Sequence, residues 1–398
     1  MGEEKIPTRR TFLKAAGSAG AAVVLGARVE ANTIPPFPEG LDRLDTMPVF
    51  QQIAWFQDKV GKTGSLWPHL RDARHLTDEH LRKIFAALAT ISKALNDPSP
   101  NKDPRVQQLK DSIGVAENFV HMYTLTLANG DSLVDIGNAQ VMQHTGRPIL
   151  RTAEHVVAAL RKRAPHLAPV LDMFQVPPPL KRGDPLPDEA VALLKRVPIM
   201  DPQDIAVPEL PFDFNPLNSL GQINIVTGFK ADGGLVKTAG IVLPTPPSMA
   251  RRIDAYLGIE SKKDTARTDA RIAQGGLMLM PRFFGESDHT DNPRARGRSG
   301  ARRLVYSPDH KQFVPAGGYI VIVGNSEVNG LSVNYVDSAS HTVRAIQTME
   351  EKFAKSRAEG SILPMLSCEP ERNKPGLWRI GPGLYLRSVR HRLRWAAQ

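Results

Sequence analysis

The stretch that divides this chain into two halves of different composition is residues 174–216, FQVPPPLKRGDPLPDEAVALLKRVPIMDPQDIAVPELPFDFNP. Ten of its residues are proline, including Pro177, Pro178 and Pro179 in succession. Because each proline fixes φ and removes a backbone donor, the segment cannot be an ordinary sheet or a long helix. One short helix is predicted within it, from Asp188 to Arg196. We expect an ordered connector that wraps the surface; a disordered linker is the alternative.

The region before the connector has helical periodicity from residue 45 to residue 173. Thr77, followed by two acids, predicts a helix start, and six apolar residues then recur at intervals of three or four: Leu81, Ile84, Phe85, Leu88, Ile91 and Leu95. A second helix is predicted from Asp103-Pro104 to Asn129-Gly130, and a shorter one from Thr152 to Arg163. The first half is therefore predicted to be helical.

The region after the connector changes to alternating apolar residues and turn signals. The predicted strands span residues 222–229, 235–243, 276–280, 318–323, 331–336, 377–380 and 384–386. Three hairpins are predicted among them, pairing 222–229 with 235–243, 318–323 with 331–336, and 377–380 with 384–386. Helices are predicted at 248–257 and 341–355. The predicted fold class is α+β, with a helical N-terminal half (32–173), a proline-rich connector (174–216) and a β-rich C-terminal half with a few helices (217–398). Whether the halves share one core is left open.

The N-terminus carries a separate signal. Thr8-Arg9-Arg10-Thr11-Phe12-Leu13-Lys14 precedes an uncharged run of small residues from Ala15 to Ala27. That run spans roughly 20 Å as a helix, too little to cross a bilayer core of about 30 Å, so a membrane anchor is not expected. The segment resembles the twin-arginine export signal, in which a hydroxyl residue, two arginines, Phe, Leu and Lys follow the same order.

This resemblance implies that residues 1–31 are a signal peptide, cleaved after the small residue Ala31. It also implies export of the folded chain to the periplasm or beyond a bacterial cell, with the twin-arginine translocase and signal peptidase as partners. The alternative is a basic N-terminus on a cytoplasmic protein.

Charge and cysteine content restrict the possible partners and cofactors. The chain has 51 Lys and Arg against 41 Asp and Glu, which favours an anionic small molecule or envelope polymer as partner, whereas nucleic acid is not expected for an exported protein. The single cysteine, Cys368, excludes an intrachain disulfide, c-type haem and iron–sulfur clusters, which need more thiols. We predict that Cys368 is buried. A non-covalent haem or a divalent metal remains possible.

The segment 284–307 is the most unusual in local composition. Asp288, His289 and Asp291 offer hard ligands for a divalent cation, with His310 as a further ligand, and the alternative is a solvated loop with local ion pairs. Arginines in the same segment have the guanidinium geometry that binds phosphate, sulfate or carboxylate: Arg294, Arg296, Arg298, Arg302 and Arg303. The segment is predicted to be a long polar loop.

Two further sets of residues are candidates for chemistry. Ser326 follows a predicted buried strand, as a nucleophile elbow would, but Val328 replaces the last glycine of G-x-S-x-G and a hairpin is predicted where an elbow needs a helix. His341, at a predicted helix start, is a candidate base, and the alternative is a surface histidine next to the helix dipole. Three histidines of the first half are candidate axial ligands of a non-covalent haem, with Arg151 able to meet a propionate, or else are satisfied core and rim groups: His80, His121 and His155.

Three classes of function remain open from the sequence. Because folded export is commonly used by proteins that acquire a cofactor first, a cofactor- or metal-dependent enzyme of oxidoreductase type is the first. A cofactor-free hydrolase acting on an anionic envelope substrate is the second. The third is a non-catalytic binding or accessory protein that uses the arginine-rich loop.

Overall fold

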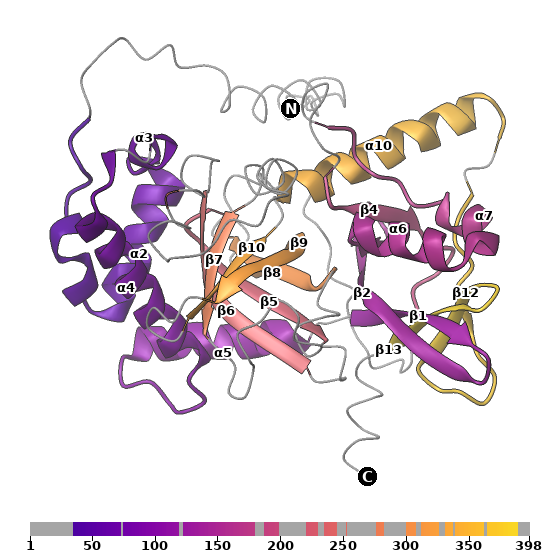
Figure 1. Cartoon of the computed structure of the whole chain (residues 1–398), viewed down its shortest axis with the longest axis horizontal. Helices are drawn as coiled ribbons and strands as arrows, with labels where there is room; N and C mark the ends of the chain where they lie inside the picture. Colours follow the sequence, from indigo (N-terminus) through magenta and orange to yellow (C-terminus); the bar gives the residue numbers. More distant parts are fainter. Residues whose placement is uncertain are drawn as a thin grey trace, which may run out of the picture. The chain divides into compact units, whose positions relative to one another are not determined.

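The computed structural model describes residues 35–72, 75–118, 122–179, 187–198, 220–229, 235–244, 252, 276–281, 300–307, 312–325, 331–336, 339–361 and 364–388. The chain forms two compact units, Met1–Pro36 and Phe37–Gln398, and the helices and strands described belong to the second. Figure 1 labels most of these elements. The predicted signal peptide and, apart from Arg252, the helix predicted at 248–257 lie outside the described residues.

The described elements before Asn118 are helical, as predicted. They are η1 Leu41–Thr46, α2 Val49–Phe56, the π-helical segment η2 Gln57–Lys62, α3 Trp67–Arg71, α4 Asp78–Asn96 and α5 Pro104–Asn118. Helix α4 begins after Thr77, whose hydroxyl accepts the backbone N–H of His80 at 3.2 Å. All six residues of the apolar stripe predicted along α4 are buried, because they face one hydrophobic core.

The helix predicted from 103 to 129 is confirmed for Pro104–Asn118 and is wrong from Met122 on. Strand β1, Met122–Asn129, follows instead, and Gly130, with φ 60°, forms the turn that leads into the next strand. A glycine in this conformation is typical of a β-hairpin turn, whereas Asn129-Gly130 was predicted to end a helix. The apolar residues of β1 also satisfy a period of two, which is the period that the fold uses: Tyr123, Leu125 and Leu127.

Strand β1 lies in a seven-stranded antiparallel sheet with the order β11-β12-β13-β1-β2-β3-β4. The other strands are β2 Ser132–His144, β3 Arg147–Thr152, β4 Ala190–Leu193, β11 Glu369–Pro370, β12 Leu377–Gly381 and β13 Leu384–Ser388. The hairpin of β12 and β13 is confirmed. The helical prediction for residues 45–173 is wrong over β1, β2 and β3.

The short helix predicted from Asp188 to Arg196 is also wrong. Residues 190–193 form β4, which pairs with β3 and is buried on both faces. A four-residue apolar run carries no alternation, so periodicity alone cannot separate a buried strand from a piece of helix.

Six strands form a closed barrel in the order β10-β7-β6-β5-β8-β9. They are β5 Ile223–Phe229, β6 Leu235–Pro244, β7 Gly276–Pro281, β8 Arg302–Ser307, β9 Gln312–Asn325 and β10 Leu331–Val336. The predicted pairs β5 with β6 and β9 with β10 are confirmed. The polar loop predicted over residues 284–307 is wrong for Arg302–Ser307, which form β8. Leu304 and Val305 of this strand are buried.

Three hydrophobic clusters hold these layers together. Helices α6 Glu154–Arg163, η4 Pro165–Leu167 and α7 Ala168–Leu171 cover one face of the seven-stranded sheet. The other face packs against α10, Ala339–Ala358, and against β8 and β9. The early helices, α4 among them, share a third cluster with β5, β6 and β8 (Figure 1). The helical segment and the barrel therefore have a common core.

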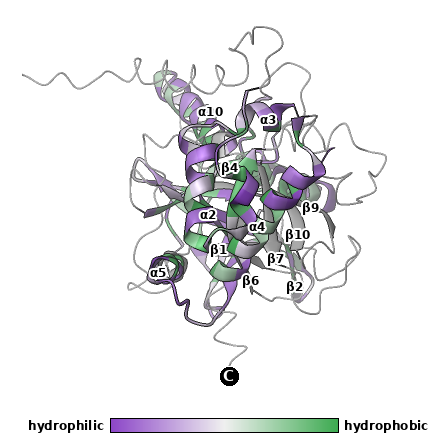
Figure 2. Ribbon diagram, turned by 90° about the vertical axis from the view of Figure 1, so that its left-hand side faces the viewer, coloured by the Kyte–Doolittle hydropathy of each residue, from purple (hydrophilic) through white to green (hydrophobic). Residues whose placement is uncertain are grey.

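The α+β class is confirmed, with helices in the N-terminal half and sheets beyond. In Figure 2 the ribbons of α4 and α10 alternate between hydrophilic and hydrophobic residues, as expected for helices with one buried face. No helix among the described residues is both long and apolar enough to cross a membrane. The division into regions 32–173, 174–216 and 217–398 stays a prediction.

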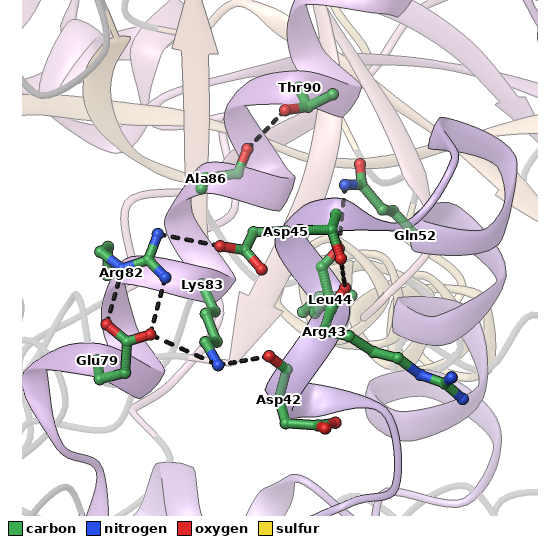
Figure 3. Close-up of polar contacts among 11 residues, drawn as sticks. Asp42, Arg43, Leu44, Asp45, Gln52, Glu79, Arg82, Lys83, Ala86 and Thr90 are labelled. Carbon is green, nitrogen blue, oxygen red and sulfur yellow. Dashed lines mark hydrogen bonds and ion pairs between the residues drawn. The ribbon is translucent and has the colours of Figure 1, made fainter.

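Polar contacts on the surface of α4 hold η1 in place (Figure 3). Arg82 bonds both carboxylate oxygens of Glu79 at 2.8 Å and reaches Asp45 of η1 at 3.0 Å. The hydrogen bond from Arg82 lowers the pKa of Glu79 to about 2. Lys83 bonds the backbone carbonyl of Asp42. The side chains of Arg82 and Glu79 are 50% and 55% exposed, so water screens their ion pair and it adds little to the stability of the fold.

Candidate functional site

Several predicted site residues fall outside the described parts of the chain. They are the candidate metal ligands Asp288, His289, Asp291 and His310, the anion-binding arginines Arg294, Arg296 and Arg298, the candidate haem ligand His121 and the candidate nucleophile Ser326. Their roles stay predictions. The described candidates are His80, His155, His341, Arg151 and the two arginines of β8, Arg302 and Arg303, of which Arg303 is buried.

His80 is part of the capping box at the N-terminus of α4. Its Nδ1 accepts the backbone N–H of Thr77 at 3.3 Å, and its ring lies 4.0 Å from that of Phe37, measured between centroids. Burial, with a contribution from the positive charge of Lys83, lowers its pKa below the ordinary value. The imidazole is therefore neutral and committed through Nδ1, so a ligand role would fall to Nε2.

His155 lies in the first turn of α6 and forms a dyad with Asp188. The N-cap residue, Ala153, has no side-chain acceptor, and Asp188 takes over that task from far along the chain. Its Oδ1 accepts the backbone N–H of His155 at 2.9 Å, and its Oδ2 lies 2.6 Å from Nδ1 of the same residue. A carboxylate at this end of a helix also interacts favourably with the helix dipole.

The two members of the dyad differ in exposure. The side chain of Asp188 is 1% exposed, whereas that of His155 is 38% exposed. Since a carboxylate only accepts hydrogen bonds, Nδ1 carries the proton of the neutral ring and Nε2 carries the lone pair. A buried acid thus orients an accessible imidazole, which is the arrangement of a general base or of a metal-ligating histidine.

Arg151 and Glu189 form a buried ion pair next to the dyad. Nε and Nη2 of Arg151 lie 2.5 and 2.7 Å from Oε1 and Oε2 of Glu189, and the two side chains are 1% and 0% exposed. The hydroxyl of Thr342, in the first turn of α10, donates to Oε1 at 3.0 Å. His341, next to Thr342, is buried. Arg151 is thus occupied by Glu189 through two of its nitrogens.

The adjacent acids Asp188 and Glu189 therefore bring together three of the described candidates. Asp188 contacts His155 on α6, while Glu189 joins Arg151 on β3 to the helix that carries His341. Neither acid was predicted from the sequence to be a site residue. A visible signal was an acidic pair directly before an apolar run, but each partner lies more than thirty residues away.

Other chemistry finds less support in the described residues. Within them no group of three or more His, Cys, Asp and Glu could hold a metal ion. Cys368 is buried, as predicted, and this desolvation raises the pKa of its thiol to about 12. The cysteine is therefore a core residue and not a reactive thiol.

Comparison with known protein families identifies one segment of the chain. Residues 7–26 match the family model of the TAT (twin-arginine translocation) pathway signal sequence. The chain carries a twin-arginine export signal. It is therefore exported folded from the cytoplasm, through the twin-arginine translocase and with signal peptidase processing. No curated protein matches the chain.

Proposed function

We propose that the exported chain is an enzyme of hydrolase type, acting in the periplasm or outside the cell, with His155 as its general base. The observation that carries this proposal is the 2.6 Å contact between Oδ2 of Asp188 and Nδ1 of His155. Nε2 takes a proton from the water that attacks the substrate, Asp188 stabilises the imidazolium that forms, and the imidazolium returns this proton to the leaving group as its bond breaks. The basic balance of the chain favours an anionic substrate.

A purely structural role explains only half of the dyad. Capping α6 needs one acceptor oxygen, and Oδ1 supplies it to a backbone N–H that a residue of almost any type at position 155 would offer. The second contact, from Oδ2 to the ring, requires histidine. Orientation of an imidazole is thus a feature that helix capping does not demand.

The test replaces each member of the dyad in protein purified from the exported fraction. Hydrolysis of chromogenic phosphate, sulfate and carboxylate esters is measured for the parent, His155→Asn and Asp188→Asn. Asn at 188 keeps an acceptor for the helix while removing the charge. We expect kcat to fall about 10²-fold or more in both variants. His166→Asn, an exposed histidine in η4, is the matched control. Undiminished turnover in His155→Asn refutes the proposal.

A second candidate is a cofactor- or metal-dependent enzyme of oxidoreductase type. The twin-arginine signal favours it, because this route carries proteins that have already folded around a cofactor. A carboxylate on Nδ1 is also the usual partner of a histidine that binds a metal through Nε2. An absorption spectrum with elemental analysis of the exported protein separates the two candidates. A bound cofactor that His155→Asn loses selects the second candidate.

A further inference from the structure

Asp188 and Glu189 directly precede β4, and their side chains contact elements on opposite sides of the sheet. Ala190 packs in the cluster under α6 and Val191 in the cluster under α10. Asp188 contacts α6, on the side of Ala190, and Glu189 contacts α10, on the side of Val191. The position of one acid therefore depends on the anchoring of the other.

Glu189 is anchored from two elements. Both of its oxygens bond Arg151, which stands on β3 between β2 and β4, and Oε1 also accepts from Thr342. The pair excludes water almost completely, so its bonds are stronger than those of surface pairs and tolerate little displacement. Glu189 thus has one well-defined position.

The dyad itself has little tolerance for movement. The contact of Oδ2 with Nδ1 measures 2.6 Å, and hydrogen bonds of this kind extend to about 3.2 Å. A shift of Asp188 by roughly 0.6 Å along that contact is enough to end it. Anchoring of the neighbouring residue is a direct way to prevent such a shift.

We propose that Glu189 is a positioning residue: its buried pair with Arg151 and its bond from Thr342 hold Asp188 against His155 and set the tautomer of that imidazole. The consequence for turnover rests on the function proposed above, whereas the effect on the tautomer does not. The first turn of α10 is thereby coupled to the dyad. Release of Glu189 is expected to lower kcat about 10²-fold with little change in KM, because a misplaced base affects the reaction and not substrate binding.

The test reads the imidazole directly. Nitrogen-15 NMR of histidine-labelled protein reports whether His155 carries its proton on Nδ1, and His155→Asn assigns the signal. We expect the parent to be in the Nδ1–H form, and Glu189→Gln and Thr342→Val to shift toward Nε2–H. Thr90→Val, which removes an exposed hydroxyl bonded to its own helix, is the control and leaves the signal unchanged.

The outcomes separate this inference from the proposed function. An unchanged His155 signal in folded Glu189→Gln and in Thr342→Val overturns the positioning role, whatever the activity. If Glu189→Gln does not fold, Thr342→Val decides alone, since it keeps the ion pair and the volume of the side chain. A shifted tautomer together with full activity in His155→Asn would uphold the positioning role and refute the proposed function.

Discussion

Replacement of Arg151 by methionine tests whether water is excluded from the ion pair with Glu189, as the burial of both side chains indicates. Methionine keeps much of the volume and removes the charge, so the buried Glu189 loses both hydrogen bonds from Arg151 and keeps the one from Thr342. A buried carboxylate that loses a cationic partner is more costly to keep charged, so its pKa rises. The stability of the variant should therefore depend on pH in a way that the parent's does not.

The magnitude follows from the cost of protonating this carboxylate. An ordinary glutamate has a pKa of about 4.3, and each pH unit above it adds about 1.4 kcal/mol to the cost of holding the acid neutral. The cost is about 3.7 kcal/mol at pH 7 and about 1 kcal/mol at pH 5. In the variant the folded-state pKa of Glu189 exceeds its unfolded value, so stability is present below that unfolded value and is lost as pH rises. We expect Arg151→Met to lose about 3 to 5 kcal/mol at pH 7 and roughly 2.7 kcal/mol less at pH 5.

Urea unfolding at the two pH values, followed by tryptophan fluorescence, measures this difference. Trp378 on β12 is buried in the sheet core and reports the transition. The double variant Arg151→Met with Glu189→Gln should show a loss that does not depend on pH between 5 and 7, because residue 189 no longer carries a carboxylate. Arg161→Met, which breaks a surface pair with Asp172, should cost under about 1 kcal/mol. An equal loss for Arg151→Met at pH 5 and pH 7 would refute the reasoning, because it would mean that water reaches Glu189.

Two further predictions concern a helix start and the cysteine. Thr77→Ala should cost about 1 kcal/mol in urea unfolding, because α4 loses its N-cap acceptor, while Thr77→Ser should retain most of the stability; equal losses would contradict the cap role. Cys368 should resist thiol reagents at pH 8 until urea unfolds the chain, since burial raises its pKa to about 12. The same shift means that stability is retained below pH 9 and falls between pH 9 and pH 12, where the unfolded thiol ionises first. Rapid stoichiometric labelling of the folded protein would contradict this prediction.

Local patterns account for the parts of the fold that were predicted correctly. Thr77 and the apolar stripe of α4 lie within five turns of one helix, and the hairpin of β12 and β13 closes across a Gly-Pro-Gly turn. In both cases neighbours in sequence are neighbours in space, so period and turn chemistry suffice. The export signal is likewise a contiguous motif, read by its own receptor and independent of the fold.

The amino-acid sequence by itself thus determined the α+β class, the export signal, the hairpins and the burial of Cys368. Tertiary structure alone decided that residues 122–129 form a strand, because their apolar positions satisfy both the helical period and period two until a neighbouring strand selects one. It also decided the candidate site. His155 was identifiable as a candidate, but Asp188 lies 33 residues away and Thr342 bonds Glu189 across 153 residues. Such contacts exist only when the sheet brings α6, β4 and α10 together, and no local pattern of residues encodes them.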